Sequence, residues 1–475
     1  MRGKLISIKI QRARYVIIDL ITTAIAFFVF NQFRFIIMNL GSGGITMESF
    51  LLSDKMVAEQ IFIPIALIGI YWLSGYYNNP FSRSRLKEFI NTIFTAVFNS
   101  LLIYLTLLTN DQLPVRYLNY EMLLVLFGCL FIFTYTGRII ITQDAIRHLA
   151  RRDWCFNTII VGENHNAILT AKRLNNAHTN LGVHIIGHLP IDGETASSDP
   201  HKTLTGKQFD ELCRSQQVDQ IILVPDKGRS DETILHLLYK YFKSNIPIKI
   251  APTSLSFLTS NIRIEDIYAE PFIDLTSPSM SDSQKNIKRV LDVVLSGLAL
   301  IVGAPIYLAL AIAVKLDSKG PVIYRQERIG YRQKPFHIYK FRSMRIDAEA
   351  GGPQLSDEDD PRTTKVGRFL RKYRLDELPQ FWNVFRGDMS LVGPRPERAY
   401  FIERIVKKAP FYTLVHQVKP GITSWGMVKF GYARTVDEMV ERSQYDLIYL
   451  SNMSVAVDFK IMIHTIKTVV LGKGM

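Results

Sequence analysis

Two adjacent carboxylates, Asp376 and Glu377, lie in a stretch of the chain that is otherwise basic. The stretch Arg371–Gln380 reads Arg-Lys-Tyr-Arg-Leu-Asp-Glu-Leu-Pro-Gln. An ionised aspartate needs no general base to attack phosphorus, so Asp376 is a candidate nucleophile. Glu377 is a candidate Mg²⁺ ligand, because this ion prefers oxygen ligands and would shield a phosphate from the nucleophile. The alternative is an acidic pair that only caps a helix.

Cations that can bind phosphate lie on both sides of this pair. Lys340 and Arg342 are expected near the end of a short strand at residues 336–341, although a Lys-x-Arg pair alone is usually solvated surface. Arginine binds a phosphate through two hydrogen bonds, and lysine binds it as a point charge. Arg395 stands between two prolines in the loop Gly387–Glu397, whose rigidity favours a side chain that is already in position.

Two helices are expected to hold the carboxylates. Apolar residues recur at helical spacing between residues 366 and 373. Asp376 is placed to cap a second helix, with Pro379 in its first turn and Gly387 at its end. Such a helix N-terminus attracts phosphate and holds a carboxylate ionised. The acidic run Asp357–Asp360 is expected to be solvated loop rather than a metal site.

A long apolar segment, Val290–Val314, precedes these residues. Cations that prefer the cytoplasmic side of a membrane flank both of its ends, namely Lys285, Lys288, Arg289 and Lys315. Pro305 lies inside the segment and is expected to break or kink a helix there. We therefore predict a re-entrant helix, at whose interface Arg289 and Asp292 form a pair. A fifth complete span is the alternative.

Four apolar stretches precede residue 145, and each is close to the about 20 residues that cross a membrane. They are Tyr15–Phe33, Ile61–Tyr77, Phe89–Thr109 and Met122–Thr142. Basic residues gather before the first stretch, between the second and third, and after the fourth. By the positive-inside rule, both termini are expected in the cytoplasm.

From about residue 154 to residue 269, short β-branched runs alternate with amphipathic helices. This pattern predicts an α/β, Rossmann-like region with parallel strands. A single glycine, Gly162, follows the first expected strand, where a dinucleotide fingerprint would have three. The spacing of Tyr239 and Lys243 matches a dehydrogenase motif but arises easily by chance on an amphipathic helix. The region is expected to serve assembly or regulation.

The 475-residue chain has a formal net charge of +14 and 48% hydrophobic residues, which fits membrane segments joined to soluble domains. The charge implies anionic partners such as membrane lipids or nucleotide phosphates. Nucleic acid is not expected, because the sequence has no arginine-rich tract or zinc-ligand pattern. Three scattered cysteines agree with a reducing cytoplasm.

Residues 285–475 resemble the bacterial sugar transferases, the polyprenyl-phosphate hexose-1-phosphate transferases that begin O-antigen, capsule and exopolysaccharide synthesis. The stretches that carry the resemblance are Lys288–Asp292, Gly320–Val322, Tyr339–Met344, Asp360–Arg362, Leu375–Gln380, Gly387–Glu397, Lys419–Thr423 and Tyr445–Asp446. The layout is similar to the long members of this family. It implies four transmembrane helices over 1–150, a non-catalytic Rossmann-like domain over 151–270, a linker at 271–284, and a mainly α (α+β) monotopic transferase domain over 285–475 with a re-entrant helix at 290–314.

The resemblance implies a two-step, ping-pong reaction. Asp376 would attack the β-phosphate of a UDP-sugar, release UMP and carry the phosphosugar until undecaprenyl phosphate accepts it. Glu377 matches the family's Mg²⁺ ligand, and Pro305 matches the proline that breaks the re-entrant helix. The positions that contact phosphate in the family are here Lys340, Arg371 and Arg395. The protein is expected in the bacterial inner membrane, with its catalytic domain on the cytoplasmic face.

One stretch departs from the family pattern. The usual Gly-Trp-Ala-Gln after the Pro-Gly-Ile-Thr block is here Ser424-Trp-Gly-Met427. It is expected away from the carboxylate pair, with a bearing on donor choice or loop packing. The later segment Val455–Val470 is amphipathic and is expected to rest on the membrane surface.

The sequence is compatible with two alternative functions. An NAD-dependent membrane sugar-nucleotide dehydratase or epimerase would also combine four spans with a Rossmann domain, but it would need an intact glycine loop. A non-catalytic membrane scaffold would use the acidic pair only structurally. Four spans and an α/β region without a cofactor also suggest a homodimer.

Overall fold

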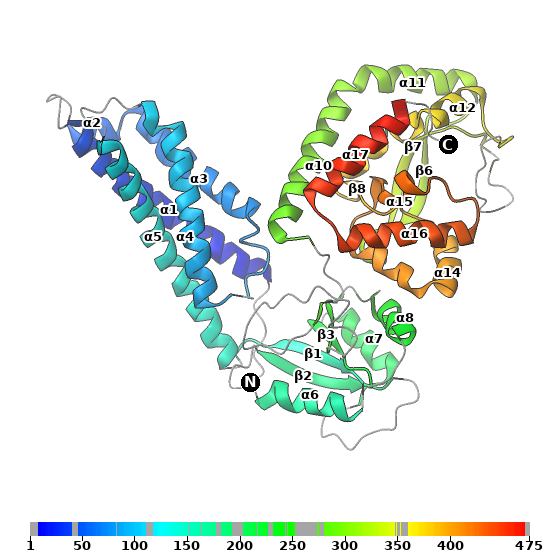
Figure 1. Ribbon diagram of the computed structural model, residues 1–475, viewed down its shortest axis with the longest axis horizontal. Helices are drawn as coiled ribbons and strands as arrows, with labels where there is room; N and C mark the ends of the chain where they lie inside the picture. The colour runs from blue at the N-terminus through cyan, green and yellow to red at the C-terminus, as the bar shows by residue number, and fades with distance from the viewer. Residues whose placement is uncertain are drawn as a thin grey trace. The chain divides into compact units, whose positions relative to one another are not determined.

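The computed structural model describes residues 8–470 apart from 40–45, 82, 111–116, 152, 163, 177–181, 192–202, 216, 227–230, 243, 245, 252–272, 275–279, 347, 349–351 and 353–359. Three parts follow one another along the chain (Figure 1): long helices, a sheet with helices, and a mixed helical and β region. Half of the expected linker at 271–284 lies outside the described residues, as does most of the run Asp357–Asp360. The Tyr239 to Lys243 spacing also lies outside them.

Four long helices form the N-terminal part. They are α1 (Ile8–Asn39), α3 (Asp54–Leu73), α4 (Arg85–Thr106) and α5 (Tyr117–Ala150), with the short α2 (Met47–Leu51) and the 3₁₀ turn η1 (Leu108–Asn110) between them. Each of the four is long and apolar enough to cross a membrane. The four predicted apolar helices are therefore confirmed, and they pack around one apolar core.

Charged side chains inside this bundle are paired. Asp19 accepts hydrogen bonds from Arg138 at 2.8 and 2.9 Å and from the Tyr77 hydroxyl at 2.8 Å. Arg34 and Glu59 form a second pair at 2.9 Å. A charge in an apolar surrounding needs such a partner, so these pairs fix α1 against α5 and α3.

The middle of the chain forms a five-stranded sheet with the order β2-β1-β3-β4-β5. Its elements are β1 (Phe156–Val161), α6 (His165–Asn176), β2 (Val183–Leu189), α7 (Gly206–Arg214), β3 (Gln220–Leu223), α8 (Asp231–Phe242), β4 (Ile248–Ile250) and β5 (Ile273–Asp274). β3 pairs in parallel with β1 and β4, whereas β5 pairs antiparallel with β4. Fully buried isoleucines such as Ile159 and Ile221 form its core. The predicted α/β region with parallel strands is confirmed.

The apolar segment before the carboxylates forms two helices, α10 (Asp282–Val302) and α11 (Ala304–Asp317), bent by 62° at the break between them. Gly303 occupies the break, where an added Cβ would lie 2.4 Å from the Ala299 carbonyl oxygen. Pro305 lies in the first turn of α11, where its missing N–H is tolerated. Glycine and proline together therefore end one helix and begin the next.

The C-terminal region carries two strand pairs. β6 (Ile323–Ile329) and β7 (Pro335–Phe341) form a hairpin around the 3₁₀ turn η2 (Tyr331–Gln333), and β8 (Ser390–Val392) pairs in parallel with β9 (Gly421–Thr423). Between the pairs lie α12 (Lys365–Lys372), the 3₁₀ turn η3 (Leu375–Glu377) and α13 (Gln380–Arg386). The remaining helices are α14 (Ala399–Lys408), the 3₁₀ helix η4 (Pro410–Gln417), α15 (Trp425–Lys429), α16 (Val436–Ser451) and α17 (Val455–Val470). Side chains from α14, η4, α16 and α17 share one core.

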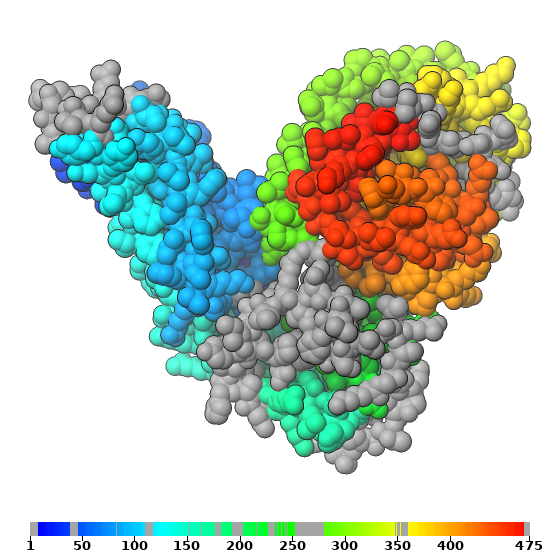
Figure 2. Space-filling view, in the orientation of Figure 1, coloured from blue at the N-terminus to red at the C-terminus, as the bar shows by residue number. Residues whose placement is uncertain are grey.

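α17 exposes a row of apolar side chains. Figure 2 shows α17 in red next to α10 in green, and the two helices are in contact. Ile461 is fully buried, whereas Phe459, Ile463 and Ile466 are 60%, 51% and 62% exposed. The exposed side of α17 also carries Lys460, His464 and Lys467, so apolar and polar side chains share it, and the contact of this segment with a membrane surface stays a prediction. An exposed apolar row of this kind suits contact with a lipid surface.

Candidate active site

Asp376 and Glu377 lie in a tight reversal of the chain between two helices. Arg374 adopts the left-handed conformation with a φ of 54°, and η3 follows it at once. α13 begins only after Pro379, and no side chain among the described residues caps it. Asp376 is therefore not the helix cap that the sequence predicted, because the 3₁₀ turn and the proline separate it from the helix. The predicted end of α13 at Gly387 is confirmed, with a φ of 102°.

Three cations surround Glu377. Lys340 on β7 donates to its Oε1 atom at 2.8 Å, and Arg395 reaches the same atom at 3.4 Å. Arg374 lies 3.7 Å from Oε2. Asp376 and Glu377 are both buried, at 8% and 5% exposure. Buried carboxylates stay charged only beside such cations.

The two carboxylates differ in how readily they ionise. Burial has the largest effect and raises the pKa of Asp376 to about 6, against the opposing attraction of Lys340. Burial also acts to raise the pKa of Glu377, but its three cations outweigh that effect and lower the pKa well below its ordinary value. Glu377 is thus a fixed negative charge, whereas Asp376 gains a proton in mildly acidic solution.

Arg371, at the end of α12, is the fourth cation of the site. It is buried, and its Nη1 atom donates to Thr363 Oγ1 at 3.0 Å. Its charge favours the ionised form of Asp376. Four cations thus surround two carboxylates, and the surplus of positive charge suits an anionic ligand.

Arg342 is engaged elsewhere. Its Nη2 atom donates to the Ser318 carbonyl oxygen at 2.6 Å and to the Ser318 hydroxyl at 2.9 Å, just after α11. Gly320 makes room for this contact, because it has a φ of 128° and an added Cβ would lie 2.2 Å from Arg342 Nη1. β7 ends at Phe341, so Arg342 does not continue the strand face that presents Lys340. The described hydrogen bonds of Arg342 tie β7 to α11 and do not join it to Asp376 or Glu377, and its role in phosphate binding stays a prediction.

The departure from the family pattern at Ser424–Met427 is linked to the carboxylate site through Arg395, a contact that the sequence did not predict. β8 and β9 run in parallel, so the segments that follow them leave the pair at the same end. Arg395 follows β8, and Met427 follows β9. The Nη1 atom of Arg395 lies 3.5 Å from Met427 Sδ, while its Nη2 atom reaches Glu377.

The predicted interface pair of Arg289 and Asp292 does not form. Arg289 donates to the carbonyl oxygens of Val384 and Phe385 at 2.8 and 2.9 Å. Asp292 accepts from the Leu391 N–H at 2.9 Å. Both side chains bind backbone groups of α13 and β8, so they fix α10 against the segments next to the carboxylates.

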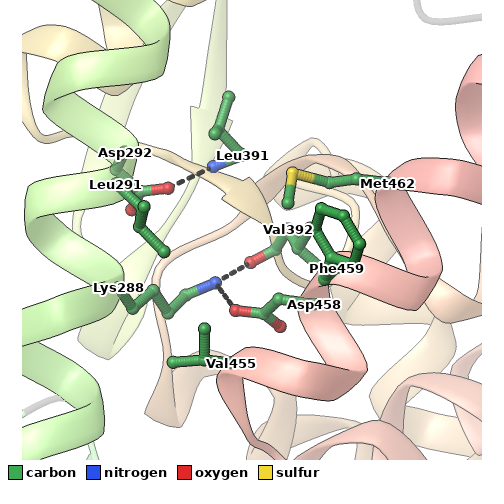
Figure 3. Close-up of a pocket in the computed structure, with 9 residues that line it drawn as sticks. All are labelled: Lys288, Leu291, Asp292, Leu391, Val392, Val455, Asp458, Phe459 and Met462. Atoms are coloured by element: carbon green, nitrogen blue, oxygen red, sulfur yellow. Dashed lines mark hydrogen bonds and ion pairs between the residues drawn. The ribbon is translucent and has the colours of Figure 1, made fainter.

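Figure 3 shows a cavity between α10, β8 and α17. Lys288 lines it and donates to Asp458 at 2.5 Å and to the Val392 carbonyl oxygen at 2.9 Å. Apolar side chains such as Leu291 and Phe459 form most of its wall. Its volume of about 40 Å³ admits a few water molecules at most. The cavity is therefore too small for a sugar nucleotide, and its polar groups join the helices.

Asp360, the described member of the acidic run, is buried rather than solvated. It accepts hydrogen bonds from the Arg362 side chain at 2.8 Å and from the Arg362 N–H at 3.0 Å, and the side-chain bond lowers its pKa. This pair closes a turn. Across the part of the chain that the structure describes, no three His, Cys, Asp or Glu side chains gather as a metal site.

Sequence reasoning missed Arg374, Tyr432 and the position of Met427. The spacing of Arg374 and Glu377, three residues apart, is a usable sign of contact within one turn. Tyr432 carries no comparable sign, because the fold alone brings its ring beneath the guanidinium groups of Arg374 and Arg395.

A family model described as bacterial sugar transferase matches residues 283–472. A UDP-N-acetylgalactosamine-undecaprenyl-phosphate N-acetylgalactosaminephosphotransferase of Aeromonas hydrophila is 38% identical over 231 residues, which cover 49% of this chain and 54% of the relative. A UDP-glucose:undecaprenyl-phosphate glucose-1-phosphate transferase of Escherichia coli K12 is 38% identical over 232 residues, which cover 48% and 50%. A protein of the same name from Caulobacter vibrioides is 40% identical over 181 residues, which cover 38% and 68%. The matched residues span about half the length of the first two relatives.

Long apolar helices, a parallel sheet and a buried carboxylate pair among cations indicate a membrane protein. The chain belongs to the bacterial sugar transferase family. The resemblance that the motifs indicate over residues 285–475 is thereby confirmed.

Proposed function

We propose that this protein transfers a sugar 1-phosphate from a UDP-sugar to undecaprenyl phosphate and releases UMP. The lipid-linked diphosphosugar would be the first membrane intermediate of a surface polysaccharide such as O-antigen, capsule or exopolysaccharide. One observation carries the proposal: Asp376 and Glu377 are buried together among four cations, in a family whose relatives are named for UDP-sugars and undecaprenyl phosphate.

In the first step, Asp376 acts as the nucleophile. One of its carboxylate oxygens attacks the β-phosphorus of the donor, and the bond from that phosphorus to the bridging oxygen breaks. The bridging oxygen keeps the electron pair and leaves with UMP. The phosphosugar is then held as an acyl phosphate on Asp376, and no proton transfer is required. Lys340 and Arg395 stabilise the charge that develops on the phosphate oxygens.

In the second step, a phosphate oxygen of undecaprenyl phosphate attacks the same phosphorus. The bond from phosphorus to Asp376 breaks, and the carboxylate regains its negative charge. Lys340 and Arg371 favour this leaving group, because both stabilise the ionised form of Asp376. Burial of Asp376 limits the access of water, which would otherwise hydrolyse the acyl phosphate.

Mg²⁺ is part of the proposal. This ion usually takes one or two carboxylates and completes its shell with phosphate oxygens and water. Glu377 fits that chemistry, since its pKa is lowered and its oxygens are hard donors. Glu377 would hold the ion together with the donor diphosphate, and the bound ion would neutralise charge on the leaving phosphate.

We also propose that α10 and α11 form a re-entrant helix, with the catalytic region on the cytoplasmic face of the inner membrane. The 62° bend and the cations at both ends support a return to the same side. Exposed apolar side chains such as Ile301 and Leu308 would lie in lipid. Tyr307 on α11 donates to the Leu378 carbonyl oxygen at 2.8 Å, so the apolar helix touches the segment next to the carboxylates.

The sheet region is proposed to be a Rossmann-like domain for assembly or regulation in a homodimer. A Cβ on Gly162 would lie 2.5 Å from the Val224 carbonyl oxygen, so close packing at the ends of β1 and β3 accounts for this glycine. Light scattering in detergent tests the dimer. Equilibrium binding of NAD tests the dehydratase alternative, which stoichiometric binding would favour.

Release of UMP from a panel of UDP-sugars tests the proposed function directly. The assay uses the full chain in nanodiscs with undecaprenyl phosphate and Mg²⁺. We expect turnover by the wild type and a loss of about 10³-fold or more in Asp376→Asn. A wild type that releases no UMP from any donor would contradict the function. Near-normal turnover by Asp376→Asn would contradict the choice of nucleophile.

A further inference from the structure

Arg374 and Tyr432 meet at the edge of the carboxylate site. The guanidinium carbon of Arg374 lies 4.9 Å from the centre of the Tyr432 ring, and that of Arg395 lies 5.5 Å from it. Both arginines also reach Glu377, at 3.7 and 3.4 Å. One aromatic ring therefore contacts two of the cations that surround Glu377.

The backbone of Arg374 is in a conformation that residues other than glycine seldom adopt. Its φ of 54° and ψ of 23° place it in the left-handed region, which costs free energy for a side chain with a Cβ. The side chain is 13% exposed and lies beside an ionised carboxylate. Strain of this kind collects where the position of a side chain matters to function.

The arginines differ in which carboxylate they affect most. Among the arginines, Arg371 has the largest effect on Asp376, whereas Arg374 and Arg395 lie against Glu377. In the proposed reaction Asp376 attacks the β-phosphorus of the donor. The other phosphate, which leaves with uridine as UMP, would then lie nearer to Glu377. Four cations and two carboxylates leave a surplus positive charge that a diphosphate can balance.

The segment that follows β9 forms a wall for these cations. Ser424 caps α15, accepting a hydrogen bond from the Met427 N–H at 2.9 Å. Met427 Sδ then meets Arg395, and Tyr432 meets both Arg395 and Arg374. A thioether accepts hydrogen bonds weakly, so Met427 leaves Arg395 available to a stronger acceptor such as phosphate.

We propose that Arg374, oriented by Tyr432, binds the donor phosphate that leaves with uridine, and therefore also binds UMP. This inference rests on the proposed function, because that function places a diphosphate beside the carboxylates. Arg374 is in this account a substrate-binding residue. Tyr432 is a positioning residue, and its ring rather than its hydroxyl supplies the contact, since the π face attracts the guanidinium group.

Four single variants of the full chain test the inference. Arg374→Asn removes the charge at a position where asparagine tolerates the left-handed backbone. Tyr432→Leu removes the ring, and Tyr432→Phe removes only the hydroxyl. Tyr400→Leu is the matched control, because Arg404 on α14 lies 4.0 Å from the centre of the Tyr400 ring, which is 40% exposed.

Two measurements are made on each variant: equilibrium dialysis with UMP, and KM and kcat for UMP release from the best donor. The Kd for UMP and the donor KM are expected to rise about ten-fold in Arg374→Asn, in line with the loss of a charged hydrogen bond. They are expected to rise about five-fold in Tyr432→Leu. Tyr432→Phe and Tyr400→Leu should stay within about two-fold of wild type. A KM effect without a similar kcat effect separates phosphate binding from a general loss of structure.

Unchanged UMP binding in Arg374→Asn would overturn the inference, and this variant decides the matter even where Tyr432→Leu does not fold. Equal losses in Tyr432→Phe and Tyr432→Leu would overturn the role of the ring. The wild type could bind UMP more tightly than Arg374→Asn and yet release no UMP from any UDP-sugar. That result would contradict the proposed function while the phosphate contact of Arg374 stands. The two failures are therefore distinguishable.

Discussion

The Nζ atom of Lys340 and the Oε1 atom of Glu377, 2.8 Å apart, make the closest ion pair at the carboxylate site. The pair joins the β6–β7 hairpin to the turn that carries Asp376. Lys340 is also the cation with the largest effect on Asp376. A single side chain therefore holds Glu377 in place and favours the ionised nucleophile.

Lys340→Met tests this dual role. Loss of the ammonium group leaves Glu377 less compensated and makes Asp376 harder to ionise, so kcat for UMP release should fall about 10²–10³-fold. Lys408→Met is the control, because it removes an exposed pair with Asp437 at 2.6 Å and should leave kcat unchanged. A Lys340→Met enzyme with wild-type kcat would remove Lys340 from the mechanism.

The rate of the first step should depend on the protonation of Asp376. Its pKa is raised to about 6, mainly by burial, and a protonated carboxyl group is a poor nucleophile. Single-turnover UMP release should therefore be constant above about pH 7 and fall about ten-fold for each pH unit below 6.

Asp446 supplies the control for this pH profile. Burial raises its pKa to about 6 as well, and its Oδ1 atom accepts a hydrogen bond from the Gly426 N–H at 3.0 Å. Asp446→Asn keeps an acceptor for that bond and should show the wild-type pH profile. A pH profile that becomes flat in Asp446→Asn would show that Asp446, and not Asp376, causes the titration.

A buried charge triad supports the loop that carries Arg395. Glu397 accepts from Arg328 at 3.0 Å and from Arg442 at 2.7 Å. Burial acts to raise the pKa of Glu397, but the arginines outweigh it and lower the pKa. The ion pairs of Glu397 therefore contribute fully to the free energy of unfolding at a pH above the pKa of an unfolded glutamate. This contribution is lost as the pH falls through the lower pKa of Glu397 in the folded protein.

Glu397→Ala should therefore destabilise the fold by about 3–5 kcal/mol, because it leaves the buried Arg442 and the largely buried Arg328 without their carboxylate partner. Thermal unfolding measured by circular dichroism checks this at pH 7.5. Asp437→Ala, which removes an exposed partner of Lys408, should cost less than about 1 kcal/mol. Equal effects of the two changes would show that the triad does not stabilise the loop.

Arg342 should behave as a structural residue. Arg342→Gln loses the hydrogen bonds to Ser318 and should lower the unfolding free energy by about 1–3 kcal/mol. The donor KM should change by less than about two-fold, because the other cations remain in place. A large rise in the donor KM with an unchanged free energy of unfolding would instead support a phosphate-binding role for Arg342.

Local sequence patterns were sufficient for several features. Four apolar helices, the parallel strands of the middle region and the end of α13 at Gly387 follow from periodicity and from glycine's tolerance of positive φ. Lys340 and Arg395, which the motifs single out, both lie against Glu377, and their contact with phosphate stays a prediction.

Local sequence patterns do not predict features that depend on contacts between distant parts of the chain. Arg342 is only two residues from Lys340, but the end of β7 separates their environments. Met427 meets Arg395 only because β8 and β9 pair in parallel. The sequence predicts a helix cap at Asp376 because the left-handed conformation of Arg374, which reverses the chain, has no signature in residue type.

Intact-protein mass spectrometry after mixing with a UDP-sugar, in the absence of undecaprenyl phosphate, tests the central claim most directly. We expect a gain of one phosphosugar mass, located by peptide mapping to Asp376. The gain should be absent in Asp376→Asn and should be lost again when undecaprenyl phosphate is added. Rapid UMP release with no covalent adduct, or an adduct on another side chain, would contradict the claim.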